Sequence, residues 1–150
     1  MISIQSYFCS SRGTDFVLIH PDLEYLIPNS HYINGAIELN VDGVVVLDCN
    51  MWDLIDQLWS YITRMLEKFR SADKASFYFP DQPLKISLER IKRKGYVKIT
   101  SHAEVRRSAV TREDDLIGSL KAAGIEFCKV MNRLDSRHNM CHELMKLESW

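Results

Sequence analysis

Polar and apolar residues alternate along the first part of the chain, a pattern typical of strands with one buried face. Residues 2–7 alternate in this way, and a short apolar run follows at 16–19. An Asp-Gly pair then separates the apolar segments 36–41 and 44–48, and it favours the positive backbone angles of a tight hairpin turn. The pattern therefore predicts strands before residue 50.

The spacing of apolar residues changes to three and four between residues 51 and 70, which predicts an amphipathic helix. Asn50 is the expected N-cap, and Asp53 and Lys68 suit the dipole at the two ends of the helix. Trp52 and Trp59 lie on the apolar stripe and are predicted to anchor the core. The stripe consists of Trp52, Ile55, Leu58, Trp59, Ile62, Met65, Leu66 and Phe69.

Strand patterns return in the second half and give way to another helix. A short aromatic strand at 76–79 ends in a proline-broken turn, and a hairpin follows, with strands at 84–91 and 97–99. Thr111 and Asp114 have the spacing of a capping box, so a helix is predicted from there to Leu134. Residues 138–147 form either a separate short helix or the tail of this one.

The order strands, helix, strands, helix predicts an α+β fold in a single domain spanning residues 1–150. Because both hairpins are local, the sheet is expected to be mostly antiparallel, with two or three helices packed on one face. The length of 150 residues suits one core. With 46% hydrophobic and 26% charged residues, the composition is that of an ordinary globular protein.

Neither a membrane-spanning apolar run nor a signal-peptide pattern is recognisable, so we expect a cytoplasmic protein. The 4 cysteines are far apart in the sequence, which predicts reduced and mostly buried thiols. Motifs for a hydrolytic serine and for a nucleotide-binding glycine loop are missing. The sequence therefore predicts a protein that is not an enzyme and has no cofactor.

One short segment has metal-ligand character, because His138, Cys141 and His142 would share about one turn of a helix. Three ligands without a distant fourth make a weak site. The favoured interpretation places Cys141 in the core and both histidines at the surface. No metal is predicted.

Charge is distributed very unevenly along the chain. Residues 1–60 carry eight acids and one base, whereas residues 61–150 carry 12 acids and 18 bases. Such a split suggests a charged partner, because opposed fields steer association. The alternative is that the two halves pair with one another in the fold.

The basic charge is densest between Lys85 and Arg112, where nine bases accompany two acids. A stripe of this kind binds nucleic acid in some proteins, but only Tyr96 within it could stack on a base. A solvated hairpin protected against edge pairing is the favoured interpretation. Nucleic-acid binding remains the alternative function.

The acidic residues of the first half are expected to form one surface around the first hairpin and the polar side of the first helix. Such a surface could imitate the phosphates that a basic nuclease recognises. The predicted partner-binding residues are Glu38, Asp42, Asp48, Asp53, Asp56, Gln57 and Ser60.

Three segments resemble small bacterial immunity proteins encoded beside polymorphic toxins of the contact-dependent growth inhibition type. They read GAIELNVDG at 35–43, MWDLIDQLWSYI at 51–62 and FPDQPLKI at 79–86, and the resemblance spans residues 33 to 134. It implies a cytosolic, non-enzymatic protein that binds one cognate toxin domain and blocks its active site or the approach of its substrate. The combined hypothesis is that this partner is a nuclease toxin.

Overall fold

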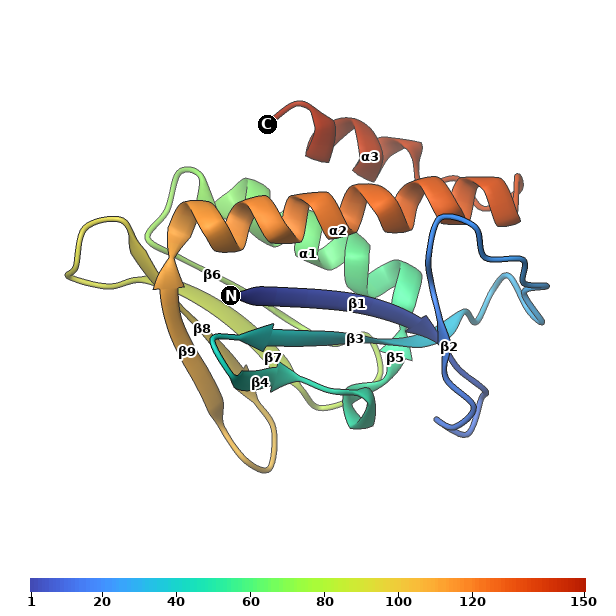
Figure 1. Ribbon diagram of the computed structural model, residues 1–150, viewed down its shortest axis with the longest axis horizontal. Coiled ribbons are helices and arrows are strands. Elements are labelled where there is room, and N and C mark those ends of the chain that lie inside the picture. The colour runs from blue at the N-terminus through green and yellow to red at the C-terminus, as the bar shows by residue number, and fades with distance from the viewer.

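Two separate antiparallel sheets form the base of the molecule, and three α-helices cover them from one side (Figure 1). The computed structural model describes all residues from Met1 to Trp150. This arrangement confirms the predicted α+β class. The strands divide between two sheets, however, instead of forming the one sheet that the hairpins suggested.

The first sheet has the strand order β2-β1-β3-β4, and β3 pairs with β1, β4 and also the short strand β5. Asp42 and Gly43 both have positive φ, at 49° and 88°, as the predicted hairpin turn requires. The strands are β1 (Ile2–Phe8), β2 (Val17–Leu18), β3 (Asn34–Val41), β4 (Val44–Leu47) and β5 (Asp53–Leu54).

The second sheet is a meander in the order β6-β7-β8-β9, in which every strand pairs with its neighbour in sequence. Ile86, Leu88, Val97 and Ile99 alternate with polar residues and are buried on the inner face. The strands are β6 (Lys74–Tyr78), β7 (Lys85–Arg90), β8 (Tyr96–His102) and β9 (Arg107–Arg112).

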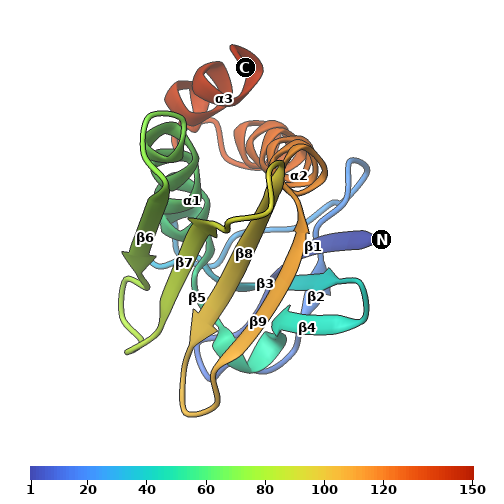
Figure 2. The ribbon, with the colours of Figure 1, turned by 90° about the vertical axis from the view of Figure 1, so that its left-hand side faces the viewer.

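The two sheets meet at the corner where β4 lies beside β9 (Figure 2). Arg107 of β9 joins them, because its guanidinium lies 2.7 Å from the Asp48 carboxylate and 3.4 Å from the Val45 carbonyl oxygen. An acid of the first half thus pairs with a base of the second half.

The helices form two layers above the sheets (Figure 2). Trp59 of α1 is fully buried, donates to Ser6 Oγ at 2.9 Å, and stacks on Phe127 of α2. The predicted role of Trp59 as a core anchor is confirmed. The helices are α1 (Ile55–Phe69), α2 (Glu113–Leu134) and α3 (Cys141–Glu148), with α3 outermost on the other two.

The first helix begins later than predicted. Residues 49–51 form the 3-10 helix η1 (Cys49–Met51), capped by Asp48, which accepts from the Asn50 N–H at 2.9 Å. The predicted Asn50 cap is therefore wrong. Trp52 lies outside the helix, half-buried against Gly13, because the following residues pair with β3. Trp52 is not the anchor of a helical stripe.

The predicted capping box at the second helix is also wrong. Thr111 is a buried residue of β9, paired with Val97, and α2 starts only at Glu113. The pairing of β9 with β8 continues to Arg112, which is the N-cap residue of α2, so Thr111 lies one position too early to cap the helix.

Candidate functional site

Asp53, predicted to lie on an exposed acidic surface, is a buried structural residue. Its side chain is 2% exposed. The carboxylate accepts from the backbone N–H groups of Asp81 at 3.1 Å and Gln82 at 2.9 Å. It also accepts from the Leu54 N–H at 2.7 Å. These bonds compensate its burial, so Asp53 is not available to a partner and the prediction is corrected.

Asp56 and Ser60 are covered by the chain's own C-terminal segment. The Asp56 carboxylate lies 2.9 Å from His138 Nε2, and Ser60 Oγ lies 3.3 Å from Glu143 Oε1. Burial raises the pKa of Asp56, and His138 partly opposes this shift. Gln57 is half-buried on the same helix. The expectation that this polar side of α1 is an open interface is therefore wrong.

The remaining three predicted residues, Glu38, Asp42 and Asp48, belong to the first sheet and its turns. Asp42 pairs with the N-terminal ammonium group, and Asp48 pairs with Arg107. Glu38 lies on β3 near Tyr7, whose pKa is raised to about 12, mainly by burial and further by the Glu38 carboxylate; the Tyr7 hydroxyl donates to Gln5 Oε1 at 2.9 Å. The seven residues do not form one acidic surface, because the protein itself pairs or buries several of them.

The side chains of His138, Cys141 and His142 near the C-terminus do not converge on one point. His138 faces Asp56, while Cys141 and His142 are exposed. Exposure of Cys141 contradicts its expected burial, and it follows from the position of Cys141 at the start of α3, where Asn132 Nδ2 contacts its sulfur at 3.7 Å. No three metal-ligand side chains gather anywhere in the structure.

The thiols divide into buried and accessible groups, and none is in a disulfide. Cys9 and Cys128 are buried, Cys49 is half-buried, and Cys141 is exposed. Burial raises the pKa of Cys9 to about 11 and that of Cys128 to about 12. Both of these thiols therefore stay protonated at neutral pH.

A group of cations with few acidic partners lies on the outer face of the second sheet. The strand register arranges its side chains in three cross-strand rows, in which cations flank a central row of hydroxyl groups. The rows are Tyr78, Lys85 and His102; then Ser76, Ser87, Thr100 and Ser108; then Lys74, Glu89, Lys98 and Val110. We call these residues the outer face.

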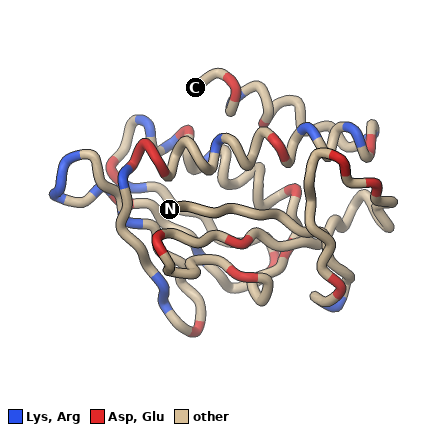
Figure 3. The backbone as a smooth tube through the Cα atoms, viewed as in Figure 1, with Lys and Arg blue, Asp and Glu red and all other residues tan.

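Few acids counter the cations of the outer face. The one ion pair within the outer face joins Lys74 to Glu89 at 3.5 Å. The Lys85 ammonium lies 5.6 Å from the centre of the Tyr78 ring. Further cations in the loops at 92–94 and at Arg106 extend the charge, as the blue segments of Figure 3 show. Burial lowers the pKa of His102, and Arg106 and Lys85 lower it further. The outer face is therefore an electropositive surface.

The basic segment 85–112 that the sequence analysis singled out contains only part of the outer face. Lys74 and Tyr78 come from β6, outside that segment, and Tyr78 is 68% exposed. Alternation in the sequence Lys74-Ala-Ser-Phe-Tyr78 was the available signal, since it places the first, third and fifth side chains on one face.

Comparison of the chain with protein-family models, curated proteins and solved structures finds no match. None of the three helices is both long enough and apolar enough to cross a bilayer.

Proposed function

We propose that this protein is a bacterial immunity protein, which binds one cognate toxin domain in the cytoplasm and neutralises it by occlusion. The resemblance of three segments to such proteins supports this proposal. The proposed action is binding, with no reaction carried out by the chain itself.

The three resembling segments contact one another in the fold. Gly35 of the first pairs with Asp53 of the second, and Asp53 binds the backbone of Gln82 in the third. The Gln82 side chain also donates to the Trp52 carbonyl. Residues of the three segments therefore connect the two sheets through hydrogen bonds, and we look for the partner surface elsewhere.

The single observation that carries the proposal is the outer face, an open sheet surface with cations that the chain leaves unpaired. Small-molecule sites are usually concave and largely apolar, whereas an open charged sheet face suits a macromolecule. Acidic side chains on a toxin domain would complement Lys85 and Lys98. The proposed contact surface is therefore basic instead of acidic.

Co-purification with the C-terminal domain encoded immediately upstream tests the function, together with a growth assay of cells making that domain. We expect a stable complex that restores growth. The variant Lys85→Glu with Lys98→Glu should slow association by about tenfold or more at low salt, because steering is electrostatic. Lys129→Glu, an exposed change on α2, is the matched control and should leave the rate nearly unchanged.

Absence of both a complex and protection would contradict the proposed function. A complex that forms equally fast with the doubly substituted protein would instead keep the function and remove the outer face from it.

Nucleic-acid binding is a second candidate, and one observation favours it: exposed hydroxyl groups at Ser76 and Ser108 lie on the same sheet face as Lys85 and Lys98. Hydroxyl and ammonium groups both bind phosphate oxygens, and Tyr78 could stack on a base. Fluorescence anisotropy with a single-stranded oligonucleotide tests this candidate. It requires affinity that falls steeply with salt and a His102 pKa that rises on binding; no binding at physiological salt excludes it.

A further inference from the structure

The strand β6 is an edge of the second sheet, and no strand pairs with its outer side. In the β6–β7 ladder, the Arg90 N–H donates to the Asp73 carbonyl and the Phe79 N–H to the Leu84 carbonyl, each at 2.9 Å. Antiparallel bonding alternates, so the odd-numbered residues of β6 bond to β7. The N–H and C=O groups of Lys74, Ser76 and Tyr78 therefore point away from the sheet, where no strand follows.

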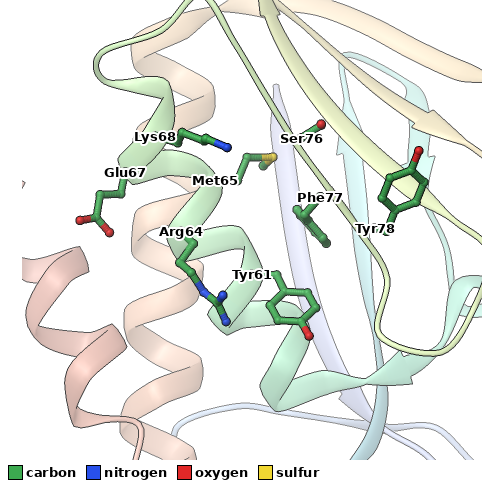
Figure 4. A pocket seen from close by; sticks show the side chains of 8 residues that line it. All are labelled: Tyr61, Arg64, Met65, Glu67, Lys68, Ser76, Phe77 and Tyr78. Atoms are coloured by element: carbon green, nitrogen blue, oxygen red, sulfur yellow. The ribbon is translucent and has the colours of Figure 1, made fainter.

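A groove of about 520 Å³ runs beside this edge, between α1 and β6. Figure 4 shows Tyr61, Met65 and Lys68 reaching from α1 toward β6. Tyr61 meets Phe77 of β6 edge to face, with ring centroids 5.9 Å apart. The groove therefore has an apolar and aromatic floor, which adjoins the inward-facing side of any strand added to β6.

The rim of the groove is positively charged. Arg64 and Lys68 are exposed and have no acidic partner, whereas Glu67, the one acid in the lining, pairs with Lys146 at 3.0 Å. On the outer face, Lys74 of β6 pairs with Glu89, and Lys85 of the neighbouring strand β7 reaches over the Tyr78 ring toward this edge. These cations would repel the identical edge of a second copy of the chain and attract an acidic strand.

We propose that the β6 edge and this groove bind an extended acidic segment of the partner protein, which adds to the second sheet as a fifth strand. Side chains of an added strand alternate between the two faces. Acidic residues of the segment contact Lys74 and Lys85, and its apolar residues enter the groove over Met65 and Phe77. That the partner is a toxin domain rests on the proposed function. That the bound segment is extended, acidic and partly apolar rests on the β6 edge and the groove alone.

The probe is a set of synthetic dodecapeptides in which glutamate alternates with valine, isoleucine, phenylalanine or tyrosine. A matched set has lysine in place of glutamate. Backbone amide shifts of the protein are followed by NMR as each peptide is added. We expect the acidic peptides to shift the amides of Lys74, Ser76 and Tyr78 and those around Tyr61, and the lysine peptides to leave them unchanged.

Substitution of Ser76 separates strand addition from simple charge attraction. Ser76→Pro removes an outward-pointing N–H and no β6–β7 bond, so the sheet is retained. Ser76→Ala keeps that N–H and is the matched control. We expect Ser76→Pro to weaken acidic-peptide binding by about tenfold or more, the loss of at least one backbone hydrogen bond, and Ser76→Ala to bind as the parent protein does.

If Ser76→Pro does not fold, acidic peptides methylated at alternate backbone nitrogens serve in its place, because they keep the charge but lose the N–H groups that would bond to β6. They should bind more weakly than unmethylated peptides of the same sequence, and equal binding would overturn strand addition. Failure of every acidic peptide to shift the β6 amides overturns the proposal.

The two proposals can fail separately. If the upstream domain co-purifies and binds Ser76→Pro as tightly as the parent, strand addition is wrong and the immunity function stands. If acidic peptides bind at β6 but the upstream domain does not bind the protein, strand addition stands and the immunity function is wrong.

Discussion

Asp53 holds the turn after β6 in place through hydrogen bonds to the backbone of Asp81 and Gln82. Replacing it by alanine would leave these donors, and that of Leu54, without their acceptor in a partly buried site. We expect Asp53→Ala to lower the free energy of unfolding by about 2–3 kcal/mol. Urea denaturation followed by circular dichroism measures the change.

Two further variants calibrate this effect. Asp53→Asn keeps one acceptor oxygen and should cost less than alanine. Asp22→Ala, at an exposed position, should change the free energy of unfolding by no more than about 0.5 kcal/mol. If the Asp53→Ala protein were as stable as Asp22→Ala, the hydrogen bonds of Asp53 would contribute nothing to the free energy of unfolding.

Asp56 should make the stability depend on pH. Burial raises its pKa above the ordinary value of 3.8, so the folded state binds its proton more tightly than the unfolded state does. As pH rises from 3.8 through the raised pKa, this group makes the folded state progressively less stable. Relative to Asp56→Asn, the parent protein should therefore lose stability over that range, as measured by urea denaturation at several pH values. A difference that does not vary with pH would contradict the shift.

The fate of single acidic residues could not be predicted from the sequence. Asp53 and Asp56 look like exposed residues of a helix start, and their burial depends on Gln82 and His138, which lie far along the chain. Local patterns carry no information on such distant partners. The count of acidic residues therefore predicted an acidic surface that does not form, because the folded chain buries or pairs these residues.

At the scale of elements, the two glycines of α2 should respond oppositely to substitution by alanine. A Cβ at Gly124 would lie 2.8 Å from Leu147 Cδ1 and 3.2 Å from the Trp59 ring, whereas a Cβ at Gly118 meets nothing within 4 Å. Gly118→Ala should stabilise the protein by about 0.5–1 kcal/mol through helix propensity. Gly124→Ala should destabilise it, because the fully buried Trp59 ring cannot move aside freely.

Thermal unfolding of both variants tests this contrast. Equal stabilisation by the two substitutions would mean that the close packing of α2 against Trp59 and α3 imposes no cost on a larger residue.

Regular elements with a strong period were predictable, and irregular joints were not. The Asp42-Gly43 turn, the β7–β8 hairpin and the long helices follow from alternation or helical spacing. The strand β9 was missed, because Arg107 and Arg112 mask its alternation and Thr111 resembles a cap. Division into two sheets was missed as well, since hairpin patterns do not say which strands share a sheet.

At the scale of the whole molecule, Arg107 and Asp48 should couple the two sheets. Their ion pair is partly shielded from water and has a 2.7 Å contact. A double-mutant cycle with Arg107→Ala and Asp48→Asn should give a coupling free energy of about 1 kcal/mol, reduced at high salt. Asparagine at position 48 retains a capping acceptor for η1, so the cycle isolates the ion pair. If the two substitutions change the free energy of unfolding additively, the Arg107–Asp48 ion pair does not couple the sheets.

The charge split along the chain predicted one acidic surface, which the fold does not form. Acids of the first half are largely neutralised or buried by the fold, as at Asp48 and Asp53, so the cations of the second sheet are left over. Net charge by segment can be counted from the sequence, but which charges remain unpaired depends on the three-dimensional arrangement.

The position of α2 also affects how the chain is made. The ribosome completes β1 more than a hundred residues before α2, which packs against β1 in the fold. The apolar side chains of β1 that meet α2 therefore wait for that helix, and the first sheet reaches its final packing only after the second sheet has been synthesised.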